Sequence, residues 1–226
     1  MKPMARWVGW LMIPLVWATP AAAQTGGLSV PRGGVIALDG RVDDAEWRGA
    51  VRTEHPAGTV VRLLRDADYL YLGITSTRPG FASVCLAQGG SVHVLHASAA
   101  LGAISYRPSG QTWRSADSAF SYGMRNTALD EAARRERAAY LAAHGWVATT
   151  VRMSGDQRSQ EFQVALARFP LPWSLAIGRW LLGDGGESWP ATITDHEACV
   201  NQQLLRGYVP QDLTFKTAHW ATIERN

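Results

Sequence analysis

The chain has 226 residues, of which 46% are hydrophobic, and it carries a formal net charge of +3. This length is enough for one domain with a substantial core, and no internal repeat or low-complexity linker divides the sequence. The basic balance does not favour a nucleic-acid partner. Lys2 and Arg6 lie in a removable leader, and the remaining chain has 20 basic against 19 acidic residues.

Residues 1–23 have the pattern of a secretory signal peptide. Two basic residues precede an apolar run at 7–17, and Ala21 and Ala23 stand at the −3 and −1 positions of the expected cleavage site. The apolar run is shorter than the roughly 20 residues that a membrane-spanning helix needs. We therefore expect export and removal of the leader, with no membrane span left in the product.

The product that begins at Gln24 is expected to be periplasmic or secreted, with residues 24–226 forming a single domain. It contains two cysteines, Cys85 and Cys199, and export places them where a disulfide persists. A bond between them would close a loop of more than a hundred residues, worth about 4–5 kcal/mol at most in the chain-entropy model. Two free buried thiols are the alternative.

The remaining sequence is rich in short β-like runs bounded by Gly, Pro, Ser or Asp. Residues 59–65 and 69–76 predict a hairpin around an Asp-rich turn. Further strands are expected at 35–38, 81–87, 91–97, 102–107, 146–153, 161–167, 173–182 and 219–224. Many short strands with turn chemistry between them favour a mainly β fold, a sandwich or a barrel.

One segment breaks this pattern and predicts an α-helix over about 127–144. It is dense in Ala, Arg and Glu, with Thr127 as the expected N-cap, Asp130 three residues later, and Gly145 at its end. Its apolar stripe is thin, so we expect the helix to lie over the sandwich or to cap one end of it.

Several motifs resemble those of the family 9 carbohydrate-binding modules and the wider DOMON-like group. IALDGRVDDAEWRGA followed by TVVRLLRDADYLYLGI is similar to the family's opening signature and strand pair. SVHVLHASAALGAISYRPSGQTW, EFQVALARFPL and WLLGDGGESWPA then resemble later strands in the same order. The resemblance implies a two-sheet antiparallel β-sandwich with the helix as an insertion, and a sugar ligand held against tryptophans.

Candidate ligand-binding residues come from their placement in this sequence. Trp113 follows a Gly turn and adjoins Arg114, and Trp189 is expected in a loop. Arg107 stands in the central strand pair, where a guanidinium would bind sugar hydroxyls. Each tryptophan has a packing role as its alternative, and Trp47 is expected in the core rather than at a ligand.

Metal and haem sites find less support in the sequence. His93 and His96 are three apart, which on a strand places them on opposite faces, so they are poorly arranged to share a metal. The triplet 195–197 would suit a cation or a solvated loop. Haem between Met and His is known in some DOMON-like domains, and Met124 and Met153 are the methionines available for it. We expect no cofactor and no metal.

No motif of a catalytic site is present. The sequence lacks nucleophile-elbow, zinc-protease and phosphate-loop patterns, and Asp184 and Glu187 lie in a Gly-rich stretch that gives no rigid support for a carboxylate pair. The sequence therefore predicts a non-catalytic carbohydrate-binding module with a glycan partner. A haem-binding or redox-associated domain and a periplasmic protein-interaction module are the alternatives.

Overall fold

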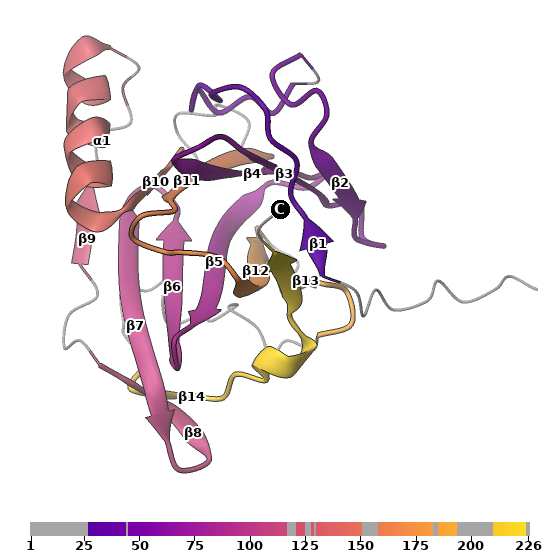
Figure 1. Cartoon of the computed structure of the whole chain (residues 1–226), viewed down its shortest axis with the longest axis vertical. Helices are drawn as coiled ribbons and strands as arrows, with labels where there is room; N and C mark the ends of the chain where they lie inside the picture. Colours follow the sequence, from indigo (N-terminus) through magenta and orange to yellow (C-terminus); the bar gives the residue numbers. More distant parts are fainter. Residues whose placement is uncertain are drawn as a thin grey trace, which may run out of the picture.

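Two β-sheets lie face to face, with one helix beside them (Figure 1). The computed structural model describes residues 27–43, 45–116, 121–124 (backbone only), 128, 130–150, 158–182, 185–193 and 210–224. The expected signal peptide and the start of the expected domain at residue 24 lie outside these residues.

The larger sheet has ten strands within the described part of the chain, in the order β1-β15-β12-β5-β6-β7-β8-β14, with β13 on β12 and β9 on β7. Their bounds are β1 Leu28–Ser29, β5 Gly80–Gln88, β6 Ser91–Ala97, β7 Leu101–Ser109, β8 Thr112–Ser115, β9 Ser121–Met124, β12 Trp173–Leu181, β13 Gly185–Trp189, β14 Asp212–Leu213 and β15 Ala221–Glu224.

The smaller sheet has five described strands in the order β10-β11-β4-β3-β2, and all of its pairs are antiparallel. Their bounds are β2 Val51–Glu54, β3 Val60–Arg65, β4 Tyr69–Thr75, β10 Trp146–Ala148 and β11 Ser159–Ala165. The predicted hairpin is confirmed as β3–β4, and the mainly β, two-sheet sandwich with one described α-helix is confirmed as well.

The expectation of purely antiparallel sheets needs a correction at one edge. The first strand, β1, runs parallel to β15, so the larger sheet is mixed. The two strands come from opposite ends of the sequence, and such a pairing carries no local turn signal. Sequence patterns that predict hairpins therefore cannot predict the pairing of β1 with β15.

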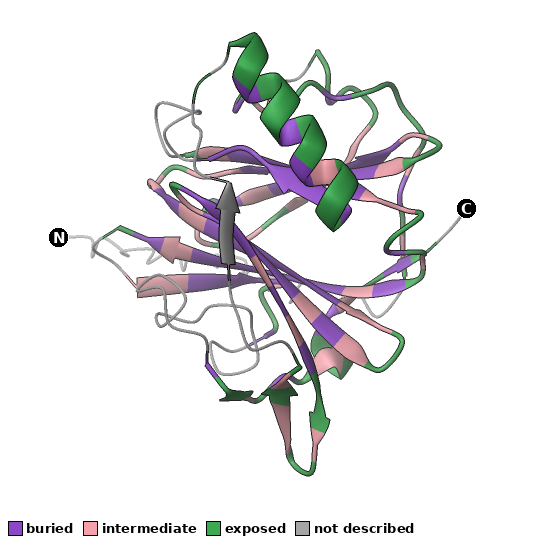
Figure 2. Ribbon diagram, turned by 90° about the vertical axis from the view of Figure 1, so that its left-hand side faces the viewer, coloured by how far each residue is buried: buried purple, intermediate pink, exposed green. Residues whose placement is uncertain are grey.

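The main core fills the space between the sheets, because alternate residues of each strand point inward. On β4 the inward set is Leu70, Leu72 and Ile74, and on β12 it is Trp173, Leu175 and Ile177. Each of these six side chains is almost completely buried. Figure 2 shows this burial as purple bands along the strands of both sheets.

The outer face of the smaller sheet is covered by the N-terminal segment, residues 33–43 and 45–50. Trp47 lies against Gly73 of β4, where a Cβ atom would stand 2.9 Å from the indole ring. Trp47 is 3% exposed and shares a cluster with Tyr71 and Leu64, which confirms its expected core role. The strand expected at 35–38 is wrong: these residues cross the face of the sheet instead of pairing with a neighbouring strand.

The outer face of the larger sheet is covered by the C-terminal part of the chain. Phe215 and Trp220 pack edge to face 5.8 Å apart, and they bury Tyr106 and Cys85 beneath them. The 3-10 helix η1 (Thr217–His219) connects this cover to the final strand. Both sheets are therefore buried on both faces over much of their area.

The helix α1 extends over Glu131–His144 and lies beside β10 at the edge of the smaller sheet. Its N-cap is Asp130, whose carboxylate accepts the Ala133 N–H, so the prediction of Thr127 as N-cap is wrong. The reason is that the aspartate offers the better acceptor one turn later, next to the positive end of the helix. Gly145 ends the helix in the left-handed conformation, as predicted.

Candidate functional site

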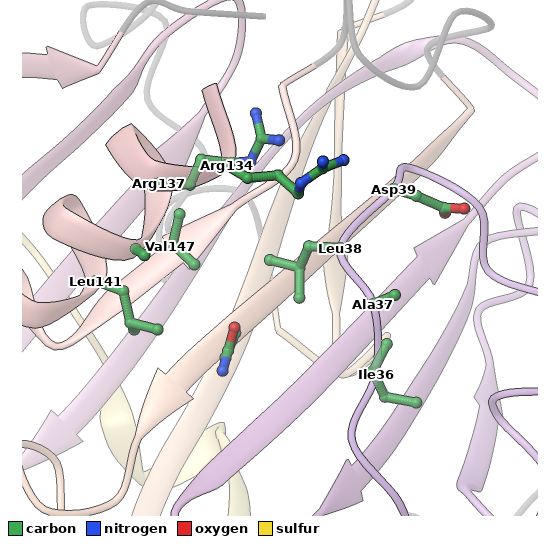
Figure 3. A pocket seen from close by; sticks show the side chains of 10 residues that line it. Ile36, Ala37, Leu38, Asp39, Arg134, Arg137, Leu141 and Val147 are labelled. Atoms are coloured by element: carbon green, nitrogen blue, oxygen red, sulfur yellow. The ribbon is translucent and has the colours of Figure 1, made fainter. Parts of the chain in front are cut away.

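A groove runs between α1 and the N-terminal segment, and β10 and β11 form its floor. Its volume is about 460 Å³, within the range of about 300–1,000 Å³ that is typical of small-ligand sites. Figure 3 shows the two walls facing each other across this space. The apolar part of the lining consists of Ile36, Ala37, Leu38, Ala138, Leu141 and Val147.

The helical wall follows directly from the spacing of α1. Arg134, Arg137, Ala138 and Leu141 stand at positions i, i+3, i+4 and i+7, which share one face of a helix. Two of these positions are apolar and two are basic. One face of the helix therefore brings aliphatic surface and guanidinium groups to the same groove.

Aromatic packing holds this helix on the sheet. Tyr140 contacts Trp146 of β10 edge to face at 5.6 Å, and Trp146 stacks on Phe162 of β11 at 6.3 Å. Trp146 and Phe162 are fully buried, whereas most of the opposite surface of α1 is exposed (Figure 2). The helical wall of the groove is thus anchored in the main core.

The facing wall is held by a buried carboxylate. Glu161 of β11 accepts the backbone N–H of Asp39 at 3.0 Å and that of Gly40 at 2.8 Å, both through Oε2. Its side chain is fully buried, and burial raises the pKa of Glu161 to about 8 against the opposing effect of the Gly40 N–H. Asp39 lines the groove, so the hydrogen bond from its backbone N–H to Glu161 fixes the backbone position of one groove residue.

The charged lining groups differ in exposure. Arg137 is only 8% exposed and donates through Nη1 to the Ala128 carbonyl at 2.9 Å, and burial lowers the pKa of its guanidinium. Arg134 is largely exposed and forms an ion pair with Glu131 at 2.7 Å. Asp39 and Gln163 complete the polar lining. The groove thus combines two cations and one anion with aliphatic walls.

Three of the ligand-binding residues predicted from the sequence lie on one hairpin, but their side chains do not converge on one face of it. Arg107 of β7 pairs in register with Arg114 of β8, and Arg114 contacts Asp212 at 3.2 Å on an exposed surface. Trp113 is the strand neighbour of Arg114 and points to the opposite face, where it packs against Phe215 at 5.9 Å. Indole and guanidinium groups therefore face different sides of the hairpin.

The fourth predicted residue, Trp189, is far more buried than expected. It ends strand β13, pairs with Ile177 and is 6% exposed in the main core, so its expected placement in a loop is wrong. Strand β13, Gly185–Trp189, pairs with β12 in a register that places Trp189 against the apolar interior. A sugar-binding role for these four residues stays a prediction.

Glu187 forms an ion-pair cluster that joins the two sheets. Its carboxylate contacts Arg179 Nη1 at 3.4 Å and Arg78 Nη2 at 3.5 Å, and it accepts the hydroxyl of Thr59. Arg179 and Glu187 are both almost completely buried. This carboxylate therefore links the two sheets. Asp184, the second carboxylate considered for a pair with Glu187, lies outside the described residues.

The histidines of β6 have separate partners on different strands. His93 Nδ1 contacts the Ser105 hydroxyl and His96 Nδ1 contacts the Ser83 hydroxyl, each at 2.8 Å. Opposite faces were expected and are confirmed, since His93 packs against Phe169 while Ser83 shares the face of Cys85. Burial lowers the pKa of His96 to about 4.

Other candidates fall on parts of the chain that are not described. These are Cys199, Met153, the side chain of Met124, and residues 195–197. Cys85 is fully buried in β5, and its predicted bond to Cys199 stays a prediction. Within the described ranges, no group of three or more His, Cys, Asp or Glu side chains is arranged to hold a metal ion.

Comparison with known proteins adds no relative: no protein-family model, no curated protein and no solved structure matches the chain. The resemblance to carbohydrate-binding modules therefore rests on the motifs alone. Among the described residues, no helix has the length and apolar character needed to cross a membrane.

Proposed function

We propose that the chain is an exported, non-catalytic binding module whose ligand site is the groove between α1 and residues 36–39. The observation that carries this proposal is the groove itself, a concave space of about 460 Å³ with aliphatic walls and a few convergent polar groups. Such a combination is the usual form of a small-molecule site.

The composition of the lining supports binding rather than catalysis. Among the described lining residues, the charged groups are one carboxylate, Asp39, and two guanidiniums, Arg134 and Arg137. A guanidinium stays protonated at all working pH values, so the described part of the lining offers no pair of groups that could exchange a proton. Asp39 is exposed and has no titratable partner among the described lining residues, so it is a poor basis for acid–base chemistry.

Export is part of the proposal and rests on residues 1–23. The basic start, the apolar run and the small residues before Gln24 are the features that a signal peptidase recognises. Expression of the full gene in a Gram-negative host should give a periplasmic or secreted product. Its intact mass should equal that of a chain beginning at Gln24. An uncleaved product in the cytoplasm would contradict export. It would not bear on the proposal that the groove binds a ligand.

The test of the groove uses ¹⁵N-labelled mature protein and a panel of neutral oligosaccharides, uronic acids and aliphatic acids. Binding in the groove predicts chemical-shift changes at Ala138, Leu141 and Val147, while Arg114 and its neighbours on β8 stay unchanged. Shifts confined to β8, or no shifts with any compound at millimolar concentration, would overturn the proposed site.

A glycan site elsewhere is the second candidate, favoured by a half-buried aromatic pair. Phe81 of β5 and Trp180 of β12 are register partners, and both lie on the outer face of the larger sheet. Adjacent aromatic rings supply the flat apolar surface against which sugar rings stack. Trp180→Ala should abolish oligosaccharide binding if this pair is the site, and unchanged affinity would exclude it.

A further inference from the structure

We infer that the groove binds an aliphatic monocarboxylate, with the carboxylate at the Arg134–Arg137 side of the helix and the hydrocarbon chain along the aliphatic walls. This inference rests on the proposed function and names its ligand class. It differs from the sugar expected from the sequence.

The walls favour a hydrocarbon over a sugar. None of the ten described lining residues is aromatic, and six of them are aliphatic. A sugar ring needs an aromatic platform or a dense set of hydrogen-bonding groups for its hydroxyls. Leu38, Leu141 and Val147 instead offer surface that is best covered by methylene groups, each worth about 0.8 kcal/mol when buried.

The buried guanidinium of Arg137 supplies the charge. An arginine carries five N–H donors, and the structure gives this one a single hydrogen bond to a described residue, the Ala128 carbonyl. A cation that is 8% exposed is poorly solvated, so an anionic partner is favourable there. A carboxylate accepts two N–H groups from a guanidinium in parallel, which a hydroxyl cannot do.

Arg134 stands one turn earlier on the same face. Its ion pair with Glu131 is exposed on both sides, with side-chain exposures of 62% and 64%, and such pairs contribute about 0–1 kcal/mol. A ligand carboxylate can therefore compete with Glu131 for this guanidinium. Two cations on one helical turn give the carboxylate a defined end of the groove.

The groove favours a ligand with one negative charge, and the one carboxylate among its described lining residues is Asp39. Its backbone is fixed by Glu161, and its Oδ1 accepts the Arg41 N–H at 2.8 Å, so the carboxylate is held at the rim of the groove. A second carboxylate at the other end of the ligand would lie against the aliphatic walls, where the described lining offers no cation to pair with it. A monoacid is therefore preferred over a diacid.

The test compares decanoate with decanol and with decanedioate, titrated into the mature protein by calorimetry at low salt. We expect decanoate to bind at least about 10-fold more tightly than either, the difference made by one charge-assisted hydrogen bond. Arg134→Gln should reduce this preference for decanoate over decanol, and so should Arg137→Lys. Arg135→Gln, on the exposed side of the same helix, should not change it.

Equal affinity of decanoate and decanol would overturn the charge assignment while leaving the groove as a binding site. Binding of neutral oligosaccharides with shifts at Leu141 would overturn the ligand class and support the proposed function. No binding of any panel member at the groove would overturn both. If Arg137→Lys fails to fold, the comparison of Arg134→Gln with Arg135→Gln decides the question alone.

Discussion

Glu161 and Gly40 lie 121 positions apart in the sequence, and the Gly40 N–H donates to the Glu161 carboxylate at 2.8 Å. The LDG turn at 38–40 and the EFQVA strand at 161–165, two motifs quoted for the family resemblance, are therefore in contact in the folded protein. Their hydrogen bond holds the N-terminal segment on the outer face of the smaller sheet. The same contact positions Asp39, which links this fold element to the groove.

Stability should fall as pH rises from about 6.5 to 8. Burial raises the pKa of Glu161 from 4.5 to about 8, so the folded state holds a proton there that the unfolded state has released. Between these values the unfolded state binds fewer protons, and the free energy of unfolding decreases with pH, by at most about 5 kcal/mol over the whole range. Urea denaturation at several pH values measures this slope.

Glu161→Gln is the matched control, because the amide keeps an acceptor for the Asp39 and Gly40 N–H groups and does not titrate. The variant should lose the slope between pH 6.5 and 8. Below pH 6.5 the lowered pKa of His96 acts in the opposite direction and removes stability as pH falls, so that range is not diagnostic. An identical slope in the variant would exclude Glu161 as its source.

The start of α1 is tested by changing its cap. Asp130→Ala removes the acceptor for the Ala133 N–H and should lower the free energy of unfolding by about 1 kcal/mol. Asp130→Asn keeps an acceptor and should lower it by less. Equal losses in both variants, measured by urea denaturation, would show that the cap hydrogen bond is not the cause.

The buried cluster of Glu187 should be sensitive to loss of one partner. Arg179→Met leaves a buried carboxylate without its most buried cation and should cost about 3 kcal/mol or more. The double change Arg179→Met with Glu187→Met should cost less than the single one. Arg52 and Glu54 form an exposed pair, so Glu54→Gln should cost under about 1 kcal/mol. A single-variant loss as small as that control would contradict this role.

The predicted disulfide between Cys85 and Cys199 can be counted directly. The exported, denatured protein should take up no thiol-alkylating reagent before reduction and two equivalents after it, as measured by intact mass. Two equivalents without reduction would show free thiols. A bond would attach the segment that contains Cys199 to the outer face of the larger sheet, because Cys85 lies on that face among Val94, Tyr106 and Ala176.

Local sequence patterns were sufficient to predict most of the strands and the helix. The β-rich runs TVVRLLR and YLYLGIT, with an Asp-rich turn between them, predicted the hairpin that β3 and β4 form. Pairings between distant segments were beyond such patterns: β1 with β15 has no hairpin between its strands. The prediction of a strand at 35–38 was wrong for a related reason, since Ile36 and Leu38 pack on a sheet face without pairing to a neighbouring strand.

The site was harder to predict, because its walls come from segments about a hundred residues apart. Arg134, Arg137 and Leu141 share a helical face, and this spacing could have marked a mixed basic and aliphatic surface. The opposite wall depends on the Glu161 contact, which only the tertiary structure brings about. Tryptophans were the less reliable guide: Trp189 is buried because large apolar rings stabilise a core most.

Filling the groove tests the central claim most directly. Ala138 lines the groove, and Ala139 is its exposed neighbour on α1 outside the lining. Ala138→Trp places an indole in the ligand space, and Ala139→Trp adds the same ring to the surface, so both should fold alike. We predict that Ala138→Trp weakens decanoate binding at least about 10-fold in calorimetry while Ala139→Trp leaves it unchanged; equal affinities in the two folded variants would contradict the groove as the ligand site.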